Sequence, residues 1–123
     1  MDKLKNKVIL IVDDEELLRE VISEFFTLEG ATVLEAGNGH DGFIVLQQNT
    51  VDIVISDLRM PNGDGLSLLQ RIKTELSYKP YVFLYSGHAD TMSEKNAEAL
   101  GATAYFVKPF SVRELVDVLA KYK

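Results

Sequence analysis

The chain has 123 residues, a net charge of −6 and no cysteine, and 46% of its residues are hydrophobic. These values favour a single compact domain with a core and exclude a disordered chain. The absence of cysteine excludes disulfides and thiolate-bound metal and fits a reducing compartment such as the cytoplasm. The negative charge disfavours direct contact with nucleic acid or an anionic membrane surface. No stretch approaches the roughly 20 apolar residues of a membrane helix.

Short apolar runs alternate with segments of helical periodicity along the whole chain. The runs predict β-strands at residues 8–12, 32–35, 53–56, 82–85 and 104–107. Their apolar content is mostly continuous, which is typical of strands buried on both faces. The first run leads directly into four carboxylates, Asp13, Asp14, Glu15 and Glu16.

The segments between the runs predict helices. Residues 17–28 form the first, with one broad apolar face, and Gly30 ends it. That face consists of Leu17, Val21, Ile22, Phe25, Phe26 and Leu28. Further helices are predicted at residues 41–48, 64–76 and 91–100, and the last of these has the thinnest apolar face. A fifth begins after Ser111, where Glu114 gives the spacing of a capping box.

Five strand–helix units in succession predict an α/β fold. A doubly wound, five-stranded parallel sheet with helices on both faces and right-handed crossovers accommodates this order. The sequence shows no linker, low-complexity segment or close repeat. We therefore expect residues 1–123 to form a single domain.

Polar residues follow four of the five predicted strands, at the edge where such sheets bind ligands. They are Asp13 and Asp14 after the first strand, Asp57 after the third, Ser86 and His88 with Gly87 between them after the fourth, and Lys108, followed by Pro109, after the fifth. Glu15 and Glu16 are interpreted differently, as residues of a first helical turn, where the helix dipole favours negative charge.

Three clustered carboxylates need either raised pKa values or a bound cation. Only oxygen ligands are available, which favours a hard cation. Mg2+ is commonly held by one or two carboxylates, keeps several waters and shares a phosphate oxygen. The residues at this edge therefore predict a Mg2+ site next to which a phosphoryl group can bind. Mn2+ could replace Mg2+. Lys108 and Ser86 would be donors to the phosphoryl oxygens.

The chain resembles the receiver domain of bacterial two-component response regulators, the CheY-like fold, over essentially its whole length. The residues that carry the resemblance are VDD (12–14), SDLRMP (56–61), DG (64–65), SGH (86–88) and YFVKPF (105–110). The family's flavodoxin-like fold implies the strand order 2-1-3-4-5. Its members are phosphorylation-dependent signalling switches.

The resemblance implies a role for each residue of the edge. Asp57 would be the nucleophile that accepts a phosphoryl group from a phosphohistidine of a sensor kinase. Asp14 would ligate Mg2+ directly, Asp13 would act mainly through bound water, and the backbone carbonyl of Arg59 would supply another ligand. Lys108 would pair with Asp57 before phosphorylation and contact the phosphoryl group afterwards.

The resemblance also implies a conformational response. Ser86 would bond a phosphoryl oxygen, and Tyr105 would turn inward as the switch residue. The output surface would comprise the fourth helix, fifth strand and fifth helix. Pro109 would follow a cis peptide bond.

Several positions depart from the family pattern or vary within it. Ser86 replaces the commoner threonine and keeps the hydroxyl. Gly63 replaces a larger apolar residue, so we expect a looser loop after Asp57. Arg59 and His88 flank the phosphorylation site and are expected to tune dephosphorylation, whereas His88 is not expected to bind metal.

The implied partners are a sensor histidine kinase or phosphotransfer protein and an unidentified output partner or domain. A monomer or a weak, phosphorylation-dependent dimer is expected. Ala104 stands where DNA-binding members that dimerise through the fourth and fifth helices usually carry an acidic residue, which disfavours that dimer.

Three other classes of protein share parts of this pattern. A flavin-binding flavodoxin would need a phosphate-binding first loop, which is acidic here. An aspartate-nucleophile phosphatase of the haloacid dehalogenase type would need an acid where Arg59 stands. The remaining alternative is a pseudo-receiver that acts only as a protein-interaction module.

Overall fold

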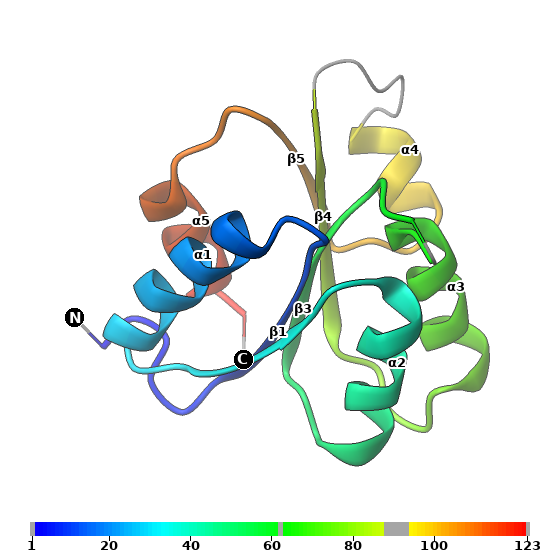
Figure 1. Ribbon diagram of the computed structural model, residues 1–123, viewed down its shortest axis with the longest axis horizontal. Coiled ribbons are helices and arrows are strands. Elements are labelled where there is room, and N and C mark those ends of the chain that lie inside the picture. The colour runs from blue at the N-terminus through cyan, green and yellow to red at the C-terminus, as the bar shows by residue number, and fades with distance from the viewer. Residues whose placement is uncertain (1, 62, 88–93, 123) are drawn as a thin grey trace.

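The computed structural model describes residues 2–61, 63–87 and 94–122. Five parallel strands form one sheet in the order β2-β1-β3-β4-β5 (Figure 1). The strands are β1 (Val8–Val12), β2 (Thr32–Ala36), β3 (Ile53–Asp57), β4 (Tyr81–Ser86) and β5 (Ala104–Val107). The predicted fold class and strand order are therefore confirmed.

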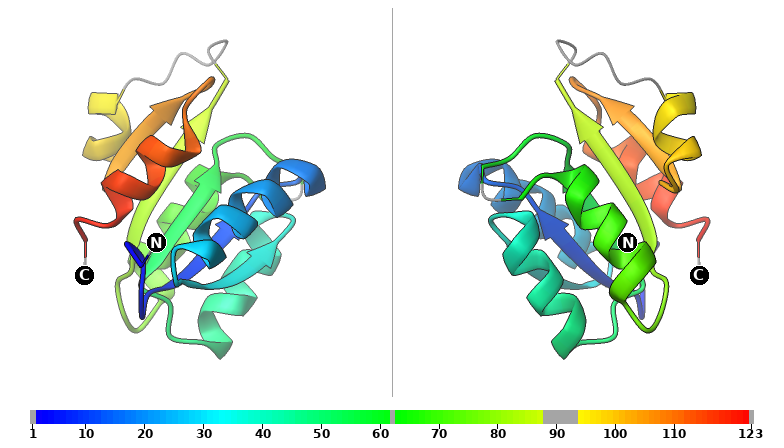
Figure 2. Two further views of the ribbon diagram at one scale, coloured as in Figure 1. Left: turned by 90° about the vertical axis from the view of Figure 1, so that its left-hand side faces the viewer. Right: turned by 90° about the vertical axis from the view of Figure 1, so that its right-hand side faces the viewer.

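Helices cover both faces of the sheet, so the molecule has three layers (Figures 1 and 2). The helices are α1 (Glu16–Leu28), α2 (Gly39–Gln48), α3 (Gly65–Glu75), α4 (Glu94–Ala99) and α5 (Val112–Leu119). Alternate residues of the central strands enter separate cores. Ile9, Ile11 and Ile55 pack with α1 and α5, whereas Leu10 and Val54 pack with α2 and α3.

The predicted element boundaries agree with the structure to within two residues wherever they can be compared. Residues 91–93 of the predicted fourth helix lie outside the described residues, and α4 is described from Glu94. Asn38 and Asp64 cap α2 and α3 by accepting backbone N–H groups from the first turn. Ser111 caps α5 by accepting the N–H of Glu114, as the capping-box spacing predicted.

The burial of α1 is narrower than its apolar face, and the expected burial of β2 was wrong. The broad apolar face of α1 buries Ile22 and Phe26, but Leu17 is 77% exposed and Leu28 69% exposed. The helix contacts the sheet along one stripe only, which leaves its outer apolar residues in solvent. β2 was expected to be buried on both faces, yet it forms the edge of the sheet, with Thr32 and Glu35 exposed.

None of the helices in the described part of the chain combines the length and apolar character needed to cross a membrane.

Candidate functional site

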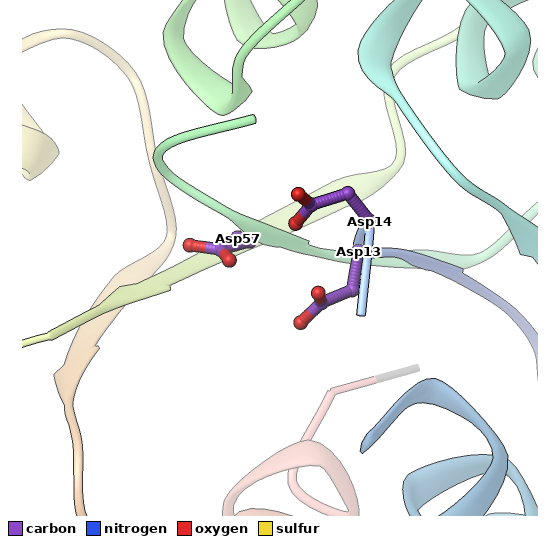
Figure 3. A group of neighbouring side chains, drawn as sticks. All are labelled: Asp13, Asp14 and Asp57. Carbon is purple, nitrogen blue, oxygen red and sulfur yellow. The ribbon is translucent and has the colours of Figure 1, made fainter. Parts of the chain in front are cut away.

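Three carboxylates meet at the carboxyl edge of the sheet. Asp13 and Asp14 follow β1, and Asp57 is the last residue of β3, the strand beside β1 (Figure 3). Since Val12 pairs with Ser56 in the parallel register, the next residue of each strand falls at the same level. One oxygen atom from each of the three carboxylates lies within 4.8 Å of the others. The clustering that the sequence predicted is therefore present.

The three carboxylates differ in their exposure to solvent. Asp13 is fully buried, Asp57 is half-buried and Asp14 is exposed. Burial, followed by the negative charge of Asp13, raises the pKa of Asp57 to about 6. The backbone N–H of Arg59 and the charge of Lys108 act against this rise. An acidic, oxygen-only cluster with this degree of repulsion has the donor chemistry that suits a hard divalent cation.

Asp13 is held by three groups of the protein. Its Oδ1 accepts the backbone N–H of Glu15 at 2.8 Å, and its Oδ2 accepts the hydroxyl of Tyr85. Its backbone carbonyl accepts Nη1 of Arg19 at 2.6 Å, and the same guanidinium pairs with Glu35 at 2.9 Å. Burial and the charge of Asp13 raise the pKa of Tyr85 far above its usual range, so the hydroxyl is protonated and donates.

Lys108 reaches the same edge from the end of β5. The peptide bond between Lys108 and Pro109 is cis, the isomer that the resemblance implies. In the described residues, Lys108 does not form the expected ion pair with Asp57, and its Nζ lies 4.0 Å from Glu15 Oε1. Nζ also lies 5.3 Å from the centroid of the Tyr85 ring. Glu15, interpreted from the sequence only as a first-turn residue, thus contacts a predicted site residue.

Ser86 and Tyr105 lie on the other face of the sheet from Tyr85. Both side chains are buried, and their hydroxyl groups share a hydrogen bond. Ser86 Oγ also lies 3.2 Å from the carbonyl oxygen of Gly87. The aromatic ring predicted to be the switch residue is therefore placed inward, in direct contact with the predicted phosphate-binding hydroxyl.

The loop after Asp57 contacts the start of α2 through Gly63. Gly63 has a φ of +109°, a conformation that favours glycine, and its carbonyl accepts the N–H of Gly39 at 2.8 Å. The backbone of Gly63, rather than a side chain, therefore makes a contact with α2, and the looser loop expected from the sequence stays a prediction. Arg59 is exposed, and its N–H donates to Asp57 Oδ1 at 3.3 Å. His88 lies outside the described residues.

Besides Glu15, sequence reasoning missed two residues that contact the site, Tyr85 and Arg19. Tyr85 carried a usable signal, since it is a tyrosine directly before Ser86 at the end of an otherwise apolar strand. A hydroxyl buried at that position needs a polar partner. Arg19 carried no such signal, because the side chain of a charged residue in the first turns of a helix is usually solvated.

The comparisons with known proteins agree with this arrangement. The family model "Response regulator receiver domain" matches residues 9–120. The chain belongs to the response regulator receiver domain family, a class that works in two-component signalling.

Individual relatives differ in how much of their length the chain covers. The sporulation initiation phosphotransferase F of Bacillus subtilis is 32% identical over 97% of this chain and 95% of its own length. The DNA-binding transcriptional regulator NtrC of Salmonella typhimurium is 31% identical over 96% of this chain, which spans 25% of that protein. The chain also spans only 51% of the probable response regulator DctR of Priestia megaterium.

Solved structures show the same fold. The Francisella response regulator 1452 receiver domain superposes with a TM-score of 0.84 at 28% identity, covering 94% of this chain and 98% of that one. The chemotaxis response regulator CheY4 of Vibrio cholerae gives a TM-score of 0.82 at 28% identity, covering 94% and 97%.

Proposed function

We propose that the chain is a phosphorylation-dependent switch whose phosphoacceptor is Asp57. The observation that carries the proposal is the cluster of Asp13, Asp14 and Asp57, with Lys108 at the same edge of the sheet. The cluster supplies a nucleophile that is mostly ionised at neutral pH, since a pKa of about 6 leaves only about a tenth of the carboxyls protonated at pH 7.

In the proposed reaction, a carboxylate oxygen of Asp57 attacks the phosphorus of a phosphohistidine. The new P–O bond forms as the P–N bond breaks, and the imidazole leaves with the electron pair of that bond. Lys108 offsets negative charge on the phosphoryl oxygens, and Ser86 donates its hydroxyl to one of them. Hydrolysis of the acyl phosphate by water later returns the carboxylate and releases inorganic phosphate.

Mg2+, or Mn2+ in its place, would neutralise charge between the carboxylates and the phosphoryl group. Asp14 and Asp57 would hold it directly, together with the backbone carbonyl of Arg59, and Asp13 would hold it through water. The donor set supports this assignment, because every candidate ligand is an oxygen atom.

The proposed output is a change in the surface of α4, β5 and α5. Capture of the Ser86 hydroxyl by the phosphoryl group would break its bond to Tyr105, a residue of β5. The partners proposed are a sensor histidine kinase or phosphotransfer protein and an output protein or domain, with the chain acting in the cytoplasm as one receiver unit. Light scattering before and after phosphorylation would show whether the protein is a monomer or a weak dimer.

The test is incubation with acetyl phosphate and Mg2+, followed by intact mass spectrometry. The mass of one phosphoryl group should appear in the wild type and in Asp117→Asn, whose exposed carboxylate lies on α5, but not in Asp57→Asn. An equal gain in Asp57→Asn would reject Asp57 as the acceptor. No gain in any protein would support a pseudo-receiver that acts only through protein interactions.

A further inference from the structure

Tyr85 connects three parts of the site although it lies outside the family motifs. It pairs with Asp57 in the register between β3 and β4, so the two side chains leave neighbouring strands on the same face. Its hydroxyl donates to Asp13 Oδ2, and its ring lies 5.3 Å from Lys108 Nζ. A single buried side chain thus contacts groups that follow β1 and β5.

The position of this hydroxyl is fixed by packing. Tyr85 is fully buried, and the ring of Phe110 meets it edge-on with centroids 5.2 Å apart. Asp13 is fully buried as well, and its second oxygen accepts the N–H of Glu15. Because each oxygen accepts a hydrogen bond from a different part of the fold, the Asp13 carboxylate cannot rotate without losing one of them.

This restraint bears on which cation the cluster accepts. Ca2+ takes six to eight oxygen ligands and often a bidentate carboxylate, whereas Mg2+ keeps several waters and needs only one or two carboxylates. A carboxylate held at both oxygens is a poor bidentate ligand but a good acceptor for a metal-bound water. The two hydrogen bonds to Asp13 therefore deprive Ca2+ of a bidentate ligand, which Mg2+ does not need.

We propose that Tyr85 is a specificity-determining positioning residue that restricts Asp13 to contacts through water and thereby favours Mg2+ over Ca2+. The inference rests on the proposed function, in which this cluster binds Mg2+. It adds a residue on β4, outside the carboxylate cluster, that sets the selectivity of the site.

The first test is Tyr85→Phe, which removes one oxygen atom and keeps the ring. Dissociation constants for Mg2+ and for Ca2+ are measured by calorimetric titration of the unphosphorylated protein. The ratio of the two constants should shift toward Ca2+ by about fivefold, the factor that corresponds to one net hydrogen bond. Tyr81→Phe, an exposed tyrosine at the other end of the same strand, should leave the ratio unchanged.

An unchanged ratio in Tyr85→Phe, with Mg2+ still bound, would overturn the inference and leave the proposed function standing. A wild type that binds neither cation would overturn both. If Tyr85→Phe fails to fold, NMR of the wild-type protein tests the inference instead. On saturation with Mg2+, the Tyr85 hydroxyl proton should persist, and the carboxyl carbon of Asp13 should shift less than those of Asp14 and Asp57. Loss of that proton would overturn the inference.

Discussion

The hydroxyl groups of Ser86 and Tyr105 share a hydrogen bond in the interior of the protein. Ser86 is the last residue of β4, and Tyr105 lies in β5, paired with Leu84. A phosphoryl group on Asp57 would compete with Tyr105 for the serine hydroxyl. The bond therefore joins a residue of the proposed phosphorylation site to β5, the strand at the edge of the sheet.

Tyr105→Phe should make phosphorylation faster. The substitution removes the partner that competes for Ser86 and keeps the ring in place, so the hydroxyl reorients at a lower cost. A net hydrogen bond is worth about 1 kcal/mol, so a rise of roughly twofold to fivefold in the rate is expected. The rate with acetyl phosphate and Mg2+ is measured by intact mass, with Tyr81→Phe as the control. A slower Tyr105→Phe would contradict this competition.

Asp57→Asn should stabilise the protein at neutral and alkaline pH in the absence of divalent cations. Its carboxyl has a pKa of about 6 in the folded protein against an ordinary value of 3.8, so ionisation opposes folding. The gain should be fully present above about pH 6, decline as the pH falls toward 4 and be absent below. After allowance for solvent screening, it is on the order of 1 kcal/mol.

Urea unfolding at several pH values measures this gain. Mg2+ should reduce it, because a bound cation stabilises the wild-type cluster. Asp117→Asn is the control, because hydrogen bonding to Lys3 lowers the pKa of that exposed carboxyl. A gain for Asp57→Asn that is constant from pH 4 to pH 8 would argue against repulsion as its cause.

Lys108→Met should raise the pKa of Asp57 further and slow its phosphorylation. The lysine charge lowers that pKa in the folded protein, although the nearer carboxylate is Glu15. Removal of one charged donor from such a site commonly costs about a hundredfold in rate, so a loss of tenfold or more is expected. Carbon NMR titration of the Asp57 carboxyl and the acetyl phosphate rate check the two effects, with Lys121→Met as the control. An unchanged pKa would show that Lys108 is too distant to act.

Gly63→Ala should destabilise the protein by roughly 1 to 3 kcal/mol. Gly63 has a φ of +109°, and an added Cβ would lie 3.0 Å from the backbone nitrogen of His40. Gly87→Ala is the matched control, because a Cβ there meets no atom of the described residues within 4 Å. Thermal and urea unfolding of both variants measure the difference. Equal stability of the two would mean that the loop adapts.

The strands and the carboxylate edge could be predicted because apolar runs and the polar residues after them are local features. Residues 8–12 and 104–107 were predicted with the bounds that β1 and β5 have. The cluster followed, because the carboxyl ends of neighbouring parallel strands must meet. Neither step required knowledge of a particular side-chain contact.

The contacts of individual side chains could not be predicted in the same way. The position of Tyr85 shows that its ring is internal, but its contact with Asp13 depends on packing across three strands. Periodicity showed which residues of α1 share a face, but not that Leu17 and Leu28 would be mostly exposed to solvent. The contact of Gly63 with α2 was not predicted, because the missing side chain was considered without the conformation that its backbone adopts.

The exposed apolar residues of α1 have a practical consequence for work with this protein. An apolar strip of α1 is exposed to solvent in the fully folded protein, and it consists of Leu17, Val21, Phe25 and Leu28. Dyes such as ANS, whose fluorescence is commonly taken as a sign of a molten globule, should bind to this strip on the native protein. A bright dye signal alone would therefore be a poor measure of misfolding here, and near-ultraviolet circular dichroism of the tyrosines is the better criterion.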